Sequence, residues 1–105
     1  MVDDSSSIAQ QIRFAIANRR LVELRYAGVA RVAEPHDYGM LNRRERLLVH
    51  QHRGPARPGQ ASIGWRLLDI SKIEGLTALE DTFSGSRGRA HRHHHQWEII
   101  YARVE

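Results

Sequence analysis

Arginine side chains lie within or beside three apolar, strand-like segments in the middle of this chain. Arg31 and Arg66 lie inside two of these segments, while Arg46 and Arg53 stand at the two ends of the third. A guanidinium group carries a permanent charge and a planar array of donors that fits the oxygens of phosphate or carboxylate. A side chain on a strand is also held more rigidly than one on a loop. We therefore expect these four arginines to contact an anion, with Arg31 and Arg66 as the main contacts.

A structural ion pair is the alternative for Arg31 and Arg66. Glu34 and Asp69 lie close to them in the sequence, and such pairs are common in folded proteins. In that case the two arginines would stabilise the fold and would not bind a ligand.

Two aromatic residues, Tyr26 and Trp65, lie in the same segments as the arginines. In proteins that bind single strands, such rings stack on the bases. In a small domain an aromatic ring also fills the core. Both roles stay open for Tyr26 and Trp65, and the ligand site that we expect includes them.

Histidines gather near the end of the chain, at His91, His93, His94 and His95. Imidazole is a common ligand of zinc, nickel and copper. Successive residues point in different directions, however, and Glu98 is the nearest carboxylate, so the cluster lacks an oriented ligand shell. We expect a basic segment whose charge grows as the pH falls, with metal binding as the alternative. His50 and His52 form a second imidazole pair on one strand face, which we expect at the surface.

The composition indicates one small domain without disulfides or membrane spans. The chain has 105 residues, 41% of them hydrophobic, which suits a single domain with a modest core. It has no cysteine, and no run of about 18 apolar residues that could cross a membrane. Its acidic and polar start lacks the basic and apolar regions of a signal peptide. We therefore expect a cytoplasmic protein.

The charged residues favour an anionic partner. The formal net charge is +4, and of 16 basic residues only Lys72 is a lysine. Basic residues dominate 43–66 and 87–95, which suggests a basic face. An ordinary solvated surface, with arginine favoured by codon usage, is the alternative. The sequence has no glycine-rich phosphate loop, no nucleophile elbow and no pair of helical histidines with an intervening glutamate, so we expect neither an enzyme nor a cofactor.

The elements that would position these residues are a helix and a series of short strands. Ile8, Ile12 and Ile16 recur at helical spacing and predict a helix over residues 5–20. Alternating and apolar segments separated by Gly and Pro predict strands over residues 21–26, 30–32, 47–52, 63–70 and 73–79, the second with a possible continuation toward Glu34. Short strands at this spacing favour a mostly β fold, a small barrel.

Turns and loops separate these elements within one domain over residues 1–105. Ala27–Gly28 is the expected turn, and residues 54–59 are an expected loop. Residues 36–45 are expected to form a loop or an irregular hairpin, with Gly39 and Asn42 as turn residues. Residues 84–95 are expected to form a flexible basic linker, because they are rich in glycine, serine, arginine and histidine.

The last segment, residues 96–105, is expected to be a helix. It places four apolar residues on one helical face, namely Trp97, Ile100, Tyr101 and Val104. A strand is the alternative, because Ile99, Tyr101 and Arg103 alternate with Ile100 and Ala102.

Two spaced motifs resemble those of the WYL domain family. The first is Tyr26-x-Gly28-x-x-Arg31-x-x-Glu34-Pro35. The second is Arg66-x-Leu68-x-x-x-Lys72-Ile73, where the family has Arg-x-Phe-x-x-x-Arg-Ile. The resemblance covers residues 8–83. The name-giving Trp-Tyr-Leu tripeptide falls at Arg46-Leu47-Leu48, where only the leucine matches, so the chain resembles a divergent member.

The resemblance implies an SH3-like, Sm-type β-barrel preceded by a helix, here as a stand-alone domain. WYL domains usually follow a DNA-binding helix-turn-helix domain in bacterial transcriptional regulators, and others accompany defence systems against phage. They are thought to sense nucleotides or nucleic-acid strands through a basic and aromatic surface. Carried over by position, the resemblance implies ligand contacts at Tyr26, Arg31 and Arg66.

Taken together, the sequence predicts a non-enzymatic regulatory module. Its ligand would be an anionic small molecule, such as a nucleotide, or single-stranded nucleic acid, held through its phosphates. The alternative is a protein-interaction or homodimerisation module that uses the barrel edge and the terminal helix. Metal binding by the terminal histidines is a third hypothesis.

Overall fold

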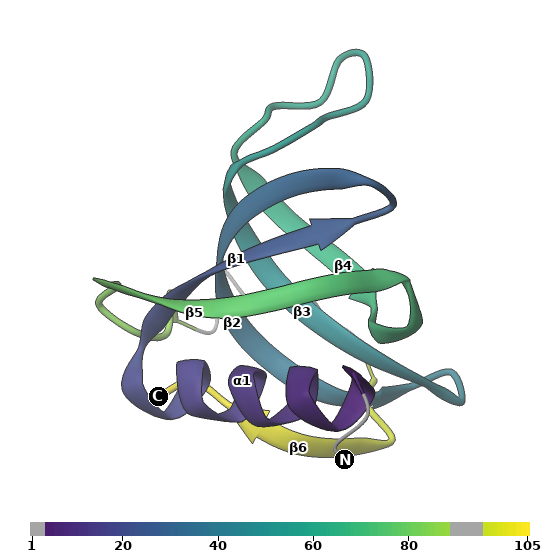
Figure 1. Ribbon diagram of the computed structural model, residues 1–105, viewed down its shortest axis with the longest axis vertical. Helices are drawn as coiled ribbons and strands as arrows, with labels where there is room; N and C mark the ends of the chain where they lie inside the picture. Colours follow the sequence, from purple (N-terminus) through teal and green to yellow (C-terminus); the bar gives the residue numbers. More distant parts are fainter. Residues whose placement is uncertain (1–3, 89–95) are drawn as a thin grey trace.

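The computed structural model describes residues 4–88 and 96–105, and only the backbone of residues 4–7. This part of the chain is mostly β, with an N-terminal helix packed on a six-stranded antiparallel sheet (Figure 1). The elements in chain order are α1 (Asp4–Asn18), β1 (Arg20–Tyr26), β2 (Val29–Leu41), β3 (Arg44–Arg53), β4 (Gly64–Asp69), the short 3-10 helix η1 (Ile70–Lys72), β5 (Ile73–Thr82) and β6 (Ile99–Arg103).

The helix α1 confirms the helical pattern of the sequence. Ile12 and Ala15 are fully buried, and they join a core that contains Val22 of β1 and Leu47 of β3. Burial of this face contributes roughly 1.5 to 3 kcal/mol for each large side chain. The helix ends at Asn18, two residues before the expected end. The next residue, Arg19, has a φ of 52°, and this left-handed conformation stops the helix and leads into β1.

Strands β1 and β2 form a hairpin whose turn lies at the expected place. Ala27 and Gly28 have φ values of 50° and 79°, as a tight two-residue hairpin turn requires. Tyr26 pairs with Val29 across the turn, and Val22 pairs with Ala33 further along. The register of this hairpin therefore sets the direction in which the side chain of Arg31 projects from β2.

Of the loop or irregular hairpin expected over residues 36–45, the structure has a hairpin, with its turn at Asn42 as expected. Strand β2 continues to Leu41, turns at Asn42 and Arg43, and pairs with β3 from Arg44 onward. Gly39, the other expected turn residue, lies inside β2, and His36 and Asp37 before it are buried at 4% and 3% exposure. Both have charged partners in the fold, so their polarity does not keep them at the surface.

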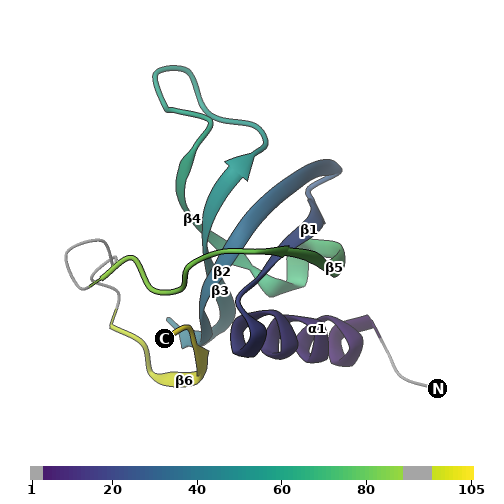
Figure 2. The ribbon, with the colours of Figure 1, turned by 90° about the vertical axis from the view of Figure 1, so that its left-hand side faces the viewer.

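Strand β2 is the centre of the sheet. The hydrogen-bonded order is β4-β3-β2-β1-β5, and β6 pairs separately with the second half of β2. A register shift between Pro35 and Asp37 marks the point where β2 changes partner from β1 to β6. The sheet is strongly curved, and α1 lies across it beside β6 (Figures 1 and 2). Among the described strands, the end strands β4 and β5 do not pair with each other. Closure of the sheet into a barrel therefore stays a prediction.

The helix expected over residues 96–105 is wrong, because Ile99–Arg103 forms strand β6. The strand pairs with β2 from Asp37↔Arg103 to Met40↔Ile99. Arg103 Nε lies 2.8 Å from Asp37 Oδ1, which fixes the register. The backbone of β6 passes directly over Gly39, where a side chain would collide with it. These tertiary contacts outweigh a weak helical pattern.

In residues 4–88 and 96–105, no helix has the length and apolar character that crossing a membrane would require.

Candidate functional site

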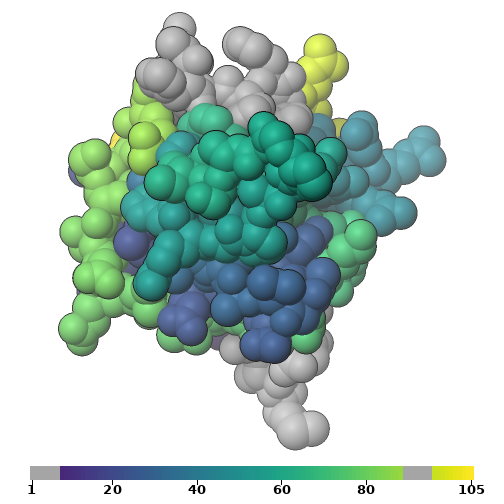
Figure 3. All heavy atoms as spheres, turned by 90° about the horizontal axis from the view of Figure 1, so that it is seen from above, coloured from purple at the N-terminus to yellow at the C-terminus, as the bar shows by residue number. Residues whose placement is uncertain are grey.

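An open cleft lies between the β1–β2 hairpin, the loop that joins β3 to β4, and β4 itself. It has a volume of about 530 Å³. Its lining residues come from all of these elements and are Tyr26, Arg31, Pro55, Ala56, Arg57, Gln60, Trp65, Arg66, Leu67 and Leu68. In Figure 3 the β3–β4 loop, in teal and green, lies beside the blue hairpin on this face of the molecule. We call this feature the Arg31–Arg66 cleft.

Arg31 is held in the cleft by neutral partners. Its Nη1 donates a hydrogen bond of 2.7 Å to Gln51 Oε1, and its guanidinium carbon lies 5.3 Å from the centre of the Tyr26 ring. Its Nε is buried and has no hydrogen-bond partner among the described residues. Burial, and then the positive charge of Arg66, lower the pKa of Arg31 below its usual value. Both arginines line the same cleft, where their like charges repel each other.

Arg66 is held by main-chain carbonyls of the neighbouring loop. Its Nη2 donates to Ala61 O at 2.6 Å, and its Nη1 donates to Trp65 O at 2.9 Å. These contacts orient the group without supplying a full negative charge. The charge of Arg66 thus stays available to an anion in the cleft.

The ion pairs that would give these two arginines a purely structural role are not formed. Within the part of the chain that the structure describes, neither Arg31 nor Arg66 lies within ion-pair distance of a carboxylate. Glu34 pairs instead with Arg87, and Asp69 pairs with Arg44. The alternative that Glu34 or Asp69 neutralises the two arginines is therefore wrong for the described residues.

The structure separates the other two expected anion contacts from the cleft. Arg53 lies with Arg31 and Glu23 on a neighbouring hollow of about 320 Å³. Arg46 lines neither the cleft nor that hollow; it stands opposite Asp69 in the β3–β4 ladder. Arg57 lines the cleft and was missed, because its loop gave no sign of folding back over β4.

Both aromatic residues line the cleft, and Tyr26 also packs against the core. Tyr26 packs against the core and accepts a hydrogen bond of 3.2 Å from the main-chain nitrogen of Asp69, while it also lines the cleft. Trp65 lines the cleft and meets the rings of His36 and His50 edge-on, with centres 4.7 and 5.0 Å apart.

Gln51 is a site residue that the sequence analysis missed. It is fully buried, and its amide nitrogen donates to the carbonyls of Pro55 and Ser62 at 3.1 and 2.7 Å. Its amide oxygen accepts from Arg31. One buried side chain thus joins Arg31 to both ends of the loop that covers the cleft. A glutamine in a strand carries no sequence signal for such a role.

A second group of polar residues, the Glu34 cluster, lies next to Trp65, whose ring meets two of its histidines. It consists of Glu34, His36, His50, His52 and Arg87. Arg87 Nη2 lies 2.7 Å from Glu34 Oε2 and Arg87 Nε lies 3.0 Å from Oε1, a two-pronged contact. The Nε2 atoms of His36 and His52 lie 2.9 and 2.7 Å from the same carboxylate.

The electrostatics of the Glu34 cluster favour a charged Glu34. Burial alone would raise the pKa of Glu34, but hydrogen bonds from Arg87, His36 and His52 outweigh it and lower the pKa to about 2. Burial lowers the pKa of His36, and burial followed by the charge of Arg87 lowers the pKa of His50. Glu34 is therefore an anion at neutral pH, with a guanidinium as its permanent counter-charge.

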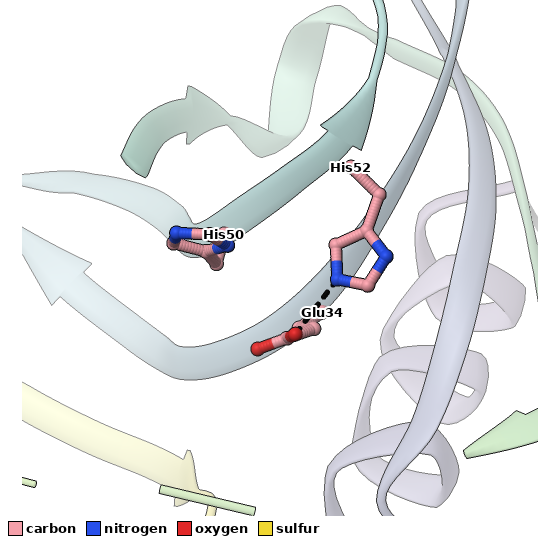
Figure 4. Close-up of side chains that lie close together, drawn as sticks. All are labelled: Glu34, His50 and His52. Atoms are coloured by element: carbon pink, nitrogen blue, oxygen red, sulfur yellow. Dashed lines mark hydrogen bonds and ion pairs between the residues drawn. The ribbon is translucent and has the colours of Figure 1, made fainter. Parts of the chain in front are cut away.

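The strand pairing brings Glu34, His50 and His52 together. Glu34 stands opposite His50 in the β2–β3 ladder, and one ligand atom from each of the three residues lies within 4.8 Å of the others (Figure 4). The surface imidazole pair that we expected is therefore half-buried beside a carboxylate. The terminal histidines His91, His93, His94 and His95 lie outside the described residues.

Comparison of this chain with protein-family models, with curated proteins and with solved structures finds no match.

Proposed function

We propose that this chain is a non-enzymatic regulatory module that binds the phosphate groups of a nucleotide or of single-stranded nucleic acid in the Arg31–Arg66 cleft. One observation carries the proposal. Arg31 and Arg66 converge on an open cleft, and neither has a carboxylate partner among the described residues. Two like charges held together raise the free energy of the empty cleft, and a bound anion would lower it.

The surroundings of the two arginines suit such a ligand. Gln51 and the carbonyl of Ala61 orient the two guanidinium groups, which reduces the entropy lost when an anion binds. Arg57 adds a third positive charge on the loop. Tyr26 and Trp65 offer ring surface beside these charges, on which a base can stack.

The family resemblance supports the same proposal from the sequence. We propose that the fold is the SH3-like, Sm-type barrel of a divergent WYL domain. The resemblance implies ligand contacts at Tyr26, Arg31 and Arg66. All three residues line the cleft. The strong curvature of the sheet and the helix packed across it support this fold assignment.

Binding titrations with nucleotides and short single-stranded oligonucleotides, each at two ionic strengths, test this function. We expect affinity to fall as salt rises, because binding releases counterions from the phosphates. Arg31→Gln and Arg66→Gln should each weaken binding about 10- to 100-fold, the usual worth of a charged hydrogen bond. Arg25→Gln is the matched control, since Arg25 is exposed on β1 outside the cleft. Absence of binding at low salt, or an equal loss in Arg25→Gln, would contradict the proposal.

The exposed edge strand β6 favours a second candidate function, a homodimerisation module. Three of its apolar residues, Ile99, Ile100 and Tyr101, are 52%, 36% and 36% exposed. The strand pairs with β2 on one side only among the described strands, so its other edge can pair with a second copy. Sedimentation should then show a dimer that Ile99→Lys dissociates. A monomer at all concentrations would contradict this candidate.

A further inference from the structure

Three side chains on adjacent strands form a set of metal-ligand type outside the Arg31–Arg66 cleft. His50 and His52 are two residues apart on β3, so both point to the same face of the sheet. Glu34 of β2 stands opposite His50, and its Oε2 lies 2.7 Å from His52 Nε2. One ligand atom from each residue lies within 4.8 Å of the others, and the His52 ring is turned toward the Glu34 carboxylate (Figure 4).

The atoms offered are those that zinc and its neighbours prefer. Imidazole nitrogen and carboxylate oxygen bind Zn²⁺, Co²⁺, Ni²⁺ and Cu²⁺. A tetrahedral zinc ion holds its ligand atoms roughly 3 to 3.5 Å apart, given bond lengths of about 2.0 to 2.2 Å. His52 Nε2 and Glu34 Oε2 lie 2.7 Å apart and would have to separate slightly around an ion, while the ligand atom of His50, within 4.8 Å of both, would have to move closer. Three protein ligands leave the fourth position to water.

Two further observations point to a missing ligand at this place. His50 Nδ1 is fully buried and has no hydrogen-bond partner within residues 4–88 and 96–105, a costly state for a polar atom. In addition, His36 Nε2 contacts the other carboxylate oxygen of Glu34, at 2.9 Å. An outer contact of this kind orients a metal-binding carboxylate.

Arg87 is the cation that pairs with Glu34 in the present structure. Its guanidinium contacts both oxygens of Glu34, and a divalent ion beside it would meet strong repulsion. Arg87 lies beyond the end of β5, outside any strand, and its side chain is 40% exposed. It can therefore leave Glu34 without breaking the sheet.

We propose that Glu34, His50 and His52 form a binding site for a divalent transition-metal ion of the zinc class. The ion binds in exchange for two groups, the guanidinium of Arg87 and the proton between His52 Nε2 and Glu34 Oε2. This site is separate from the proposed phosphate site, and neither proposal depends on the other.

The experiment uses the full chain in a background without competing histidines. Of the seven histidines, four lie in the terminal cluster, so the variant His91→Gln, His93→Gln, His94→Gln, His95→Gln keeps only those of the Glu34 cluster. Zn²⁺ is measured by equilibrium dialysis, and Co²⁺ by its visible absorption. We expect one ion per chain, and its uptake should release protons.

Substitutions within this background identify the ligands. His50→Gln and His52→Gln should each abolish binding, while His36→Gln should weaken it about 10- to 100-fold, as loss of an outer contact does. Arg87→Gln should bind more tightly, because the competing cation is gone. Circular dichroism in a chelator shows whether each variant is folded, and two independent ligand variants keep the test decisive if one is not.

A spectroscopic signal locates the ion. The Trp65 ring centre lies 5.0 Å from that of His50, so Co²⁺ should quench the fluorescence of Trp65 in a Trp97→Phe version of the same background. The proposal is overturned if the background variant binds no metal, or if both His50→Gln and His52→Gln bind it as tightly. Unchanged affinity in Arg87→Gln would overturn the exchange with the guanidinium.

Discussion

At the scale of single residues, the fold is organised around buried polar side chains. Gln51 is fully buried and Glu34 is 4% exposed, yet each has all of its hydrogen-bonding partners within reach. A buried polar group that loses its hydrogen-bond partner lowers the free energy of unfolding by about 1 to 3 kcal/mol. Substitutions at these positions should therefore be more damaging than at exposed charges.

The stability of the protein should fall in acid because of Glu34 and its histidines. A pKa of about 2, against an ordinary 4.5, means that the carboxylate stabilises the fold above pH 4.5 and that this stabilisation is lost between 4.5 and 2. The lowered pKa of His36 acts earlier, since protonation of the unfolded chain near pH 6.5 already favours unfolding. Urea unfolding in a chelator at several pH values measures both effects.

The variant Glu34→Gln tests whether Glu34 causes the loss of stability in acid. The variant should be less stable at pH 7 by about 3 kcal/mol, the worth of the pKa shift, and its free energy of unfolding should vary less between pH 5 and 3. Glu80→Gln is a control, because Glu80 is an exposed carboxylate on β5. Parallel acid slopes for wild type and Glu34→Gln would refute the role of Glu34.

At the scale of elements, β6 depends on a glycine in the strand beside it. A Cβ built on Gly39 would overlap the carbonyl oxygen of Ile99 and lie 3.0 Å from Ile100 Cα, so β6 packs there only because position 39 has no side chain. The φ of Gly39 lies outside the left-handed region, so the requirement is one of space and not of backbone conformation.

Gly39→Ala should therefore displace β6. We expect a loss of about 1 to 3 kcal/mol in the free energy of unfolding, as for other overpacked sites, and faster hydrogen exchange at the amides of Ile99–Arg103. Gly75→Ala in β5 is the matched control, because a Cβ there meets nothing within 4 Å. If the two variants were equally stable, the tight contact at Gly39 would not be real.

At the scale of the whole molecule, α1 and the sheet share one core. Ile12 and Ile16 belong to the same buried cluster as residues from β1 to β5, and Val104 closes the cluster from the end of the chain. A helix of this length has little stability in isolation, so α1 should form and melt together with the sheet.

Ile12→Ala should destabilise the entire domain. The fully buried side chain leaves a cavity, with an expected cost of about 2 to 5 kcal/mol. Phe14→Ala is the control, because Phe14 lies on the same helix at 46% exposure and should lose about 1 kcal/mol or less. Helical circular dichroism and tryptophan fluorescence should follow one unfolding curve. Separate transitions would show that helix and sheet are independent units.

The sequence by itself determined the elements whose signals are local. The isoleucines of α1, the turn at Ala27–Gly28 and the loop after Arg53 were predictable, because helical periodicity and turn residues act over a few neighbours. Of the six residues expected at the ligand site, Tyr26, Arg31, Trp65 and Arg66 line one cleft, while Arg46 and Arg53 do not.

Only the tertiary structure decided what depends on strand register and on partners distant in sequence. The sequence left the second half of β2 open between a loop and an irregular hairpin, because its buried polar residues find their partners elsewhere, as Asp37 does in Arg103, 66 residues away. Strand β6 looked like a helix because its partner strand was not visible in its own sequence. The Glu34 cluster exists only because the β2–β3 register sets Glu34 opposite His50. Such pairings follow from the summed packing of the whole chain, which no local pattern contains.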